Sequence, residues 1–102
     1  MKFAIRWDLI AINSLKEESD FILKKWNFSE VENFHALVEM SLERFSVNPT
    51  IGIYNSVLKV HSYVISRQTT LYYTLNEKNK TIELHVFWNN LKNPKKLHKL
   101  LK

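Results

Sequence analysis

The spacing of apolar residues changes in the middle of this chain, at its single glycine, Gly52. Between Ile12 and Gly52 the apolar residues recur every three or four positions, which is typical of amphipathic helices. After Gly52 they recur at every second position, which is typical of half-buried strands. A chain of 102 residues is long enough for one hydrophobic core. The pattern therefore predicts an α+β fold in a single domain covering residues 1–102.

The first half of the chain predicts a strand followed by a helical hairpin. Residues 2–7 (KFAIRW) alternate as a strand does, and Asp8 then offers an N-cap. A first helix follows. Its predicted packed side consists of Ile12, Leu15, Ser19, Ile22 and Trp26, and its predicted solvent side consists of Lys16, Glu17, Glu18, Asp20, Lys24 and Lys25. A capping box at residues 29–32 predicts the start of a second helix, which Asn48-Pro49 ends. Its predicted stripe is Val31, Phe34, Val38, Leu42 and Phe45. The short turn makes the two helices antiparallel.

The second half predicts three antiparallel strands, Val57–Ile65, Thr69–Leu75 and Thr81–Trp88, and a closing helix from Pro94. The order of elements is therefore β-α-α-β-β-β with a terminal helix, and the helical hairpin covers one face of the sheet. Alternation assigns the following side chains to the other, open face: Lys59, His61, Tyr63, Tyr72, His85 and Phe87. A solvated sheet face usually carries Thr, Lys and Glu, so this set predicts a binding surface.

The charge of the chain is concentrated in its second half. Residues 1–50 hold six basic and eight acidic side chains, whereas residues 51–102 hold nine basic and two acidic ones, a net of +7. This asymmetry favours a polyanionic partner, although a solvated basic face has the same composition. The absence of cysteine excludes disulfides, thiolate metal sites and thiol catalysis. Without a signal sequence or a long apolar run, we expect a cytoplasmic protein with no membrane partner.

Four stretches of this sequence resemble the RelE/ParE superfamily, the plasmid-stabilisation toxins of bacterial type II toxin–antitoxin systems. They are Trp7-Asp8 with Ala11 and Leu15, Asn48-Pro49 with Gly52, residues 63–65 followed by residues 69–73, and residues 82–90 (IELHVFWNN) running into residues 93–97 (NPKKL). The last stretch is the most specific. The resemblance implies a small basic toxin that an acidic antitoxin holds inactive. In this superfamily RelE-like members cleave messenger RNA on the ribosome without a metal or cofactor, and ParE-like members inhibit DNA gyrase by binding.

Metal-free RNA cleavage requires a base, an acid and cations around the phosphate. His61 and His85 are the candidate proton-transfer groups, and Lys59 and Arg67 are the candidate phosphate-binding cations of a catalytic site. The candidate RNA-contacting residues are the aromatic side chains Tyr63, Tyr72 and Trp88 and the basic side chains Lys92, Lys95 and Lys96. The basic tail is also suited to bind an acidic antitoxin segment, and it has the composition of a solvent-exposed helix end as well.

One position departs from the superfamily pattern. Related toxins often carry an arginine in the turn after the last strand, where this chain has Leu91. A leucine cannot stabilise an anionic transition state, so either Lys92 replaces the arginine or the protein is not a nuclease. Three functions stay open on the sequence: a ribosome-dependent mRNA endoribonuclease, a gyrase-binding toxin, and a small RNA-binding module.

Overall fold

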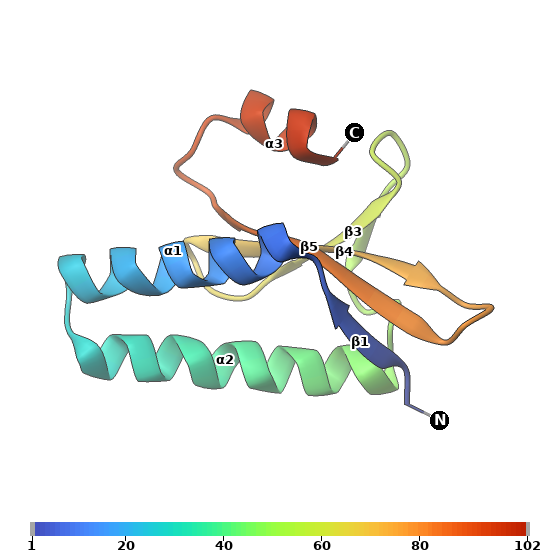
Figure 1. Cartoon of the computed structure of the whole chain (residues 1–102), viewed down its shortest axis with the longest axis horizontal. Helices are drawn as coiled ribbons and strands as arrows, with labels where there is room; N and C mark the ends of the chain where they lie inside the picture. Colours follow the sequence, from blue (N-terminus) through green and yellow to red (C-terminus); the bar gives the residue numbers. More distant parts are fainter. Residues whose placement is uncertain (1, 102) are drawn as a thin grey trace.

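The computed structural model describes residues 2–101, in which a helical hairpin lies on one side of a five-stranded sheet and a short helix lies on the other (Figure 1). The elements in chain order are β1 (Ala4–Trp7), α1 (Leu9–Lys25), α2 (Phe28–Val47), β2 (Ile53–Asn55), β3 (Val60–Val64), β4 (Thr69–Asn76), β5 (Thr81–Asn89) and α3 (Pro94–Leu101). Within these residues no helix combines the length and the apolar character that a membrane crossing requires. The predicted α+β fold, with a helical hairpin and a closing helix, is confirmed.

The sheet has the strand order β1-β5-β4-β3-β2. β1 pairs with β5 in parallel, and each of the other neighbouring pairs is antiparallel. The predicted single strand Val57–Ile65 is wrong at its first residues, because residues 56–59 form a tight turn between a separate edge strand, β2, and β3. The Asn55 side chain accepts hydrogen bonds from the N–H groups of Val57 and Leu58, and Lys59 takes a left-handed φ of 57°.

The main core fills the space between the helical hairpin and the sheet. The α2 stripe predicted from the sequence is confirmed, since Val31, Phe34, Val38 and Phe45 are buried and Leu42 packs against them. The side chain that caps α2 is that of Asn27, which accepts a hydrogen bond from the Glu30 N–H at 3.0 Å, so the predicted capping box at residues 29–32 is wrong.

The packed face of α1 also differs from the prediction. Ala11, Ser14, Glu18 and Ile22 are buried, whereas the predicted core residues Ile12 and Trp26 are about half exposed. Glu18 was expected in solvent and is 3% exposed. The helix is rotated from the predicted orientation because polar groups of β4 and β5 receive the Glu18 carboxylate.

A bulge in β5 decides which residues face which helix. The register passes from Tyr72 opposite Val86 to Tyr73 opposite Leu84, which leaves His85 as the extra residue. Beyond the bulge the side-chain alternation is shifted by one position, so Phe87 enters the main core and stacks on Trp7 with ring centroids 5.6 Å apart. The prediction that Phe87 faces outward with His85 is therefore wrong.

The sheet face opposite the hairpin is partly covered, not open as predicted. Leu97 of α3 packs against Val86 and Trp88, and Tyr72 and Leu101 border this second cluster. Figure 1 shows α3 on the far side of the sheet from α2. We call this side of the sheet the α3 face.

Candidate functional site

A line of three hydrogen-bonded side chains crosses the α3 face. His85 Nδ1 lies 2.7 Å from Asp8 Oδ2, and His85 Nε2 lies 2.8 Å from Thr74 Oγ1. Asp8 occupies the N-cap position of α1, but its carboxylate makes no capping hydrogen bond and is directed to His85 instead. A residue that gives up its usual local role for a distant partner is typical of a functional site.

Two carboxyl groups stand beside His85. The hydrogen bond to Asp8, together with burial, raises the pKa of Glu83. Burial alone would raise the pKa of Asp8, but hydrogen bonds to Glu83 and His85 and the nearby positive charges of His85 and Arg6 outweigh it and lower that pKa. Asp8 is therefore the carboxylate that stays ionised toward His85. One ligand atom from each of Asp8, Glu83 and His85 lies within 4.8 Å of the others, so this cluster is also the place in residues 2–101 with the donor set for a divalent cation.

His85 lines a cavity of about 370 Å³. Lys59 and Thr74 line this cavity with His85, and Leu100 and Leu101 of α3 also line it. The structure thus brings together His85 and Lys59, two of the four predicted catalytic residues. A proton acceptor and a cation in one cavity can act on a phosphodiester.

A larger groove of about 590 Å³ lies between α3 and the turn that follows β5. Its basic lining residues are Lys92, Lys96 and Lys99, beside Trp88 and Asn93. Lys92 Nζ lies 5.6 Å from the centroid of the Trp88 ring and 3.5 Å from Glu17 Oε2. Leu100 lines both the groove and the His85 cavity, so the two hollows are neighbours along α3. We call the larger hollow the lysine groove.

Several predicted site residues lie elsewhere. His61 pairs with Tyr73 and Tyr63 pairs with Leu71, which places both side chains on the hairpin face of the sheet. The His61 ring stacks on the Tyr73 ring at 5.3 Å, and burial lowers the pKa of His61. The predicted grouping of His61 and Tyr63 with His85 is therefore wrong, because the sheet separates them. The aromatic ring of Tyr63 adds more buried area against Phe45 than the Val64 side chain would, and Val64 is exposed instead.

Two aromatic residues remain on the α3 face. Tyr72 is half-buried beside Trp88, and burial raises its pKa. Trp88 is 7% exposed because Leu97 packs against it. Little of the Trp88 ring is therefore free for stacking on a base. The lysines of the groove are more accessible than this ring.

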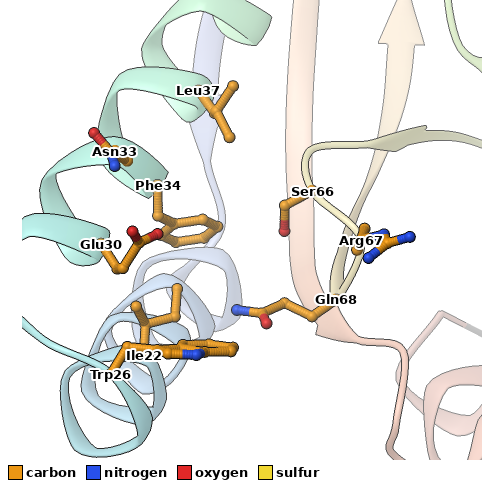
Figure 2. Close-up of a pocket in the computed structure, with 9 residues that line it drawn as sticks. All are labelled: Ile22, Trp26, Glu30, Asn33, Phe34, Leu37, Ser66, Arg67 and Gln68. Carbon is orange, nitrogen blue, oxygen red and sulfur yellow. The ribbon is translucent and has the colours of Figure 1, made fainter.

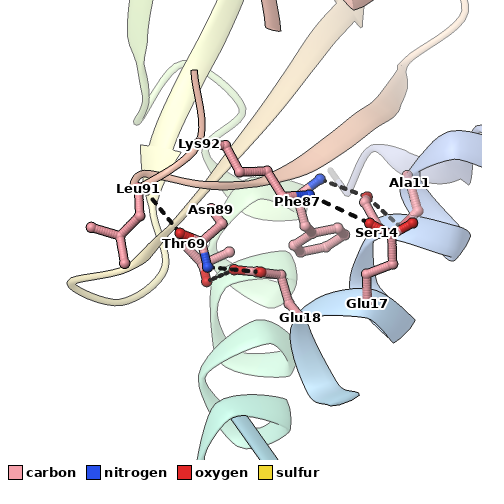
Figure 3. A network of polar contacts seen from close by, with 9 residues as sticks. All are labelled: Ala11, Ser14, Glu17, Glu18, Thr69, Phe87, Asn89, Leu91 and Lys92. Atoms are coloured by element: carbon pink, nitrogen blue, oxygen red, sulfur yellow. Dashed lines mark hydrogen bonds and ion pairs between the residues drawn. The ribbon is translucent and has the colours of Figure 1, made fainter. Parts of the chain in front are cut away.

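The turn after β5 is held by a polar network that the sequence analysis missed (Figure 3). The buried Glu18 carboxylate accepts hydrogen bonds from Thr69 Oγ1 and Asn89 Nδ2, and Asn89 Oδ1 accepts one from the Leu91 N–H. The Leu91 side chain is 78% exposed. The spacing of Ala11, Ser14, Glu18 and Ile22 on one helical face was the signal that could have revealed the burial of Glu18.

Arg67 lies beside this turn. Asn90 donates hydrogen bonds to the backbone carbonyls of Arg67 and Gln68, at 3.2 and 2.7 Å, and so ties the β3–β4 turn to the residue before Leu91. The backbone of Arg67 therefore lies close to the turn where the superfamily pattern has an arginine.

Comparison with solved structures identifies the architecture. A chain of the toxin–antitoxin complex RelBE2 from Mycobacterium tuberculosis superposes with a TM-score of 0.62 and 15% sequence identity, over 88% of this chain and 100% of that chain. This chain has a RelE-like fold. No protein-family model and no curated protein sequence matches it. The RelE-like fold confirms the architecture that the sequence resemblance implied, and the roles of the individual side chains stay predictions.

Proposed function

We propose that this RelE-like chain is the toxin of a type II toxin–antitoxin module and that it cleaves ribosome-bound messenger RNA at the His85 cavity. The fold supports the toxin role, since its solved counterpart belongs to a toxin–antitoxin complex. The observation that carries the cleavage proposal is the hydrogen-bonded line from Asp8 through His85 to Thr74. It has the geometry of a general base with its orienting carboxylate.

The proposed reaction is attack of a ribose 2′-hydroxyl on the adjacent phosphate. An ionised Asp8 accepts the His85 Nδ1–H, which leaves the Nε2 lone pair to accept a proton. Thr74 Oγ1 now occupies the position beside Nε2, and the substrate hydroxyl takes its place. Asp8 then stabilises the imidazolium that forms, and the Lys59 ammonium at the cavity wall stabilises the negative phosphorane. The bond from phosphorus to the 5′-oxygen then breaks, and the leaving 5′-oxygen takes the proton from the His85 imidazolium, so that the products are a 2′,3′-cyclic phosphate and a 5′-hydroxyl.

The test is RNA cleavage in a reconstituted translation system, with and without ribosomes. We expect the wild-type chain to cut messenger RNA only with ribosomes, and His85→Ala to slow cleavage by about 10²–10⁴-fold, the usual contribution of a general base. His61→Ala is the matched control, because that histidine lies on the opposite face of the sheet. Intact message at toxic doses of the wild-type protein, or equal rates for the two variants, would overturn the proposal.

The lysine groove supports the partner part of the proposal. Within the described residues, α3 contains lysines and a histidine but no acidic side chain. An acidic antitoxin segment laid in this groove would neutralise Lys92, Lys96 and Lys99 and close the way to the neighbouring His85 cavity. This arrangement provides a physical means of inhibition.

A second candidate function is a toxin that inhibits DNA gyrase by binding alone. The exposed Leu91, at the position where the superfamily pattern has an arginine, favours it. The separation of His61 from His85 also favours it, because no two-histidine acid–base site forms. In that case purified protein inhibits gyrase supercoiling, and the His61→Ala/His85→Ala double variant stays as toxic as the wild type.

A further inference from the structure

A separate cavity lies on the hairpin side of the molecule, between the tip of the α1–α2 hairpin and the β3–β4 turn (Figure 2). Its volume is about 290 Å³. Ile22 and Phe34, both buried, form part of its wall, and the Trp26 ring, 48% exposed, forms another part. Lys25, which does not line the cavity, lies over the Trp26 ring with Nζ 4.8 Å from the centroid. The cavity thus combines an apolar interior with one accessible aromatic ring.

Five polar side chains surround this apolar interior. Glu30 and Asn33 come from α2, and Ser66, Arg67 and Gln68 come from the β3–β4 turn. Within residues 2–101 none of these five side chains makes a side-chain hydrogen bond or an ion pair with another group of the protein, and the Ser66 hydroxyl is buried. Convergent polar groups without partners around an apolar pocket are typical of a ligand site.

We propose that this cavity binds the guanine base of a nucleotide in single-stranded RNA. The volume lies near the lower end of the range for ligand pockets, about 300–1,000 Å³, and suits one base better than a larger ligand. Trp26 provides a stacking surface, which every base can use. Selection among bases then depends on the polar groups.

Glu30 gives the cavity its preference. A carboxylate accepts hydrogen bonds only, and it can accept two side by side. Guanine presents two adjacent N–H donors on its Watson–Crick edge, N1–H and N2–H, whereas adenine and cytosine present one amino group next to an acceptor, and uracil presents one ring N–H between two carbonyls. The amides of Asn33 and Gln68 add donors for the guanine carbonyl, and Arg67, which points outward at the rim in Figure 2, can contact a phosphate.

An apolar side chain of a protein partner fits this cavity less well. It would cover Glu30, Asn33 and Gln68 without giving them hydrogen bonds, so these groups would lose their hydrogen bonds to water without replacement. A base satisfies the same groups. The chemistry of the lining therefore favours a nucleotide over an apolar anchor residue.

This inference goes beyond the proposed cleavage, since it concerns the opposite side of the sheet and can hold whether or not His85 is catalytic. If both hold, the cavity provides a contact for an RNA base away from the cleaved bond. Nucleotide binding is measured without ribosomes, so failure of one proposal is distinguishable from failure of the other.

The experiment is a titration of the full chain with GMP, AMP, CMP and UMP, followed by tryptophan fluorescence. Trp26 is the sensitive reporter, because Trp7 stacks on Phe87 and Trp88 is buried. We expect saturable quenching with GMP and at least tenfold weaker binding of the other three nucleotides. Trp26→Leu should remove the response, and calorimetry of this variant should show weaker binding of GMP.

The decisive variant is Glu30→Gln, which should weaken GMP binding at least tenfold and remove the preference for guanine. Glu32→Gln is the matched control, since Glu32 is exposed on the same helix and does not line the cavity. Circular dichroism verifies the fold, and Glu30→Asp provides a second variant that keeps the charge but shortens its reach. Arg67→Gln should weaken GMP but not guanosine.

Three results would overturn the proposal: no saturable GMP binding, equal affinities for the four nucleotides, or an unchanged affinity in Glu30→Gln. Saturable binding of an acetylated leucine or phenylalanine amide in the absence of GMP binding would also overturn it and would assign the cavity to protein docking.

Discussion

The buried Glu18 carboxylate should be one of the most costly polar groups to replace in this protein. Glu18 is 3% exposed, and its partners Thr69 and Asn89 are 0% and 4% exposed, so water cannot replace a lost hydrogen bond. The carboxylate accepts from both donors. In Glu18→Gln the new amide can accept from Asn89, but its NH₂ then faces Thr69, whose own hydroxyl proton loses its acceptor. One orphaned donor costs about 1–3 kcal/mol, and Glu18→Ala, which orphans both donors, should cost about 2–6 kcal/mol.

Urea unfolding followed by circular dichroism measures these losses directly. Glu17→Gln is the matched control: Glu17 is exposed and only reaches Lys92 at 3.5 Å, so its replacement should change the free energy of unfolding by less than about 0.5 kcal/mol. If the free energy of unfolding of Glu18→Gln lies within that same margin of the wild type, the claim that the lost Glu18 hydrogen bond destabilises the fold is refuted. Because small domains have a total stability of only about 5–15 kcal/mol, the Glu18→Ala protein should be close to unfolding.

Two further predictions concern stability. In Gly52→Ala the added Cβ would lie 2.6 Å from both the Ser62 carbonyl oxygen and the Tyr73 hydroxyl. We therefore expect the free energy of unfolding, measured with urea, to fall by about 1–3 kcal/mol. The Gly52→Ala/Tyr73→Phe double variant should lose less than the sum of the two single variants, and additive losses would show that the Tyr73 hydroxyl does not clash with the added Cβ. The raised pKa of Glu83 means that its ionised form is disfavoured in the folded chain, so the wild type loses stability as pH rises through that pKa. Glu83→Gln should therefore melt at a higher temperature than the wild type at pH 7, and the gain should vanish below the ordinary pKa of 4.5; a constant gain across pH would contradict the linkage.

The order of the elements could be predicted because each local spacing of apolar residues fitted only one type of secondary structure. Val31, Phe34, Val38 and Phe45 recur at helical spacing and are buried in α2, and Leu71 and Tyr73 alternate as a strand does and are buried in β4. Such spacing follows from the 3.6-residue period of a helix and the two-residue period of a strand. The rotation of α1 could not be predicted in this way, because a buried glutamate needs partners that lie 51 and 71 residues further along the chain.

The candidate site was predictable in its residue types but not in its grouping. His85 and Lys59 were identified from their chemistry, and the structure places them in one cavity. His61 and Tyr63 were assigned to the wrong face, since alternation gives two sets of side chains but does not tell which set meets the hairpin. The role of Asp8 in holding His85 depends on the parallel pairing of β1 with β5, which joins residues 77 positions apart.

The sequence by itself determined the α+β class, the helical hairpin, the closing helix and the basic second half of the chain, because all of these depend on neighbours within a few positions. The tertiary structure decided which side chains meet. One bulge at His85 exchanged Val86 and Phe87 between the two faces of β5, and α3 covered a surface expected to be open. The cavity at Trp26 also exists only in the fold, because its walls come from the hairpin tip and a turn about 40 residues further along the chain. Contacts over such distances are set by the packing of whole elements, which a local pattern of apolar and polar residues does not contain.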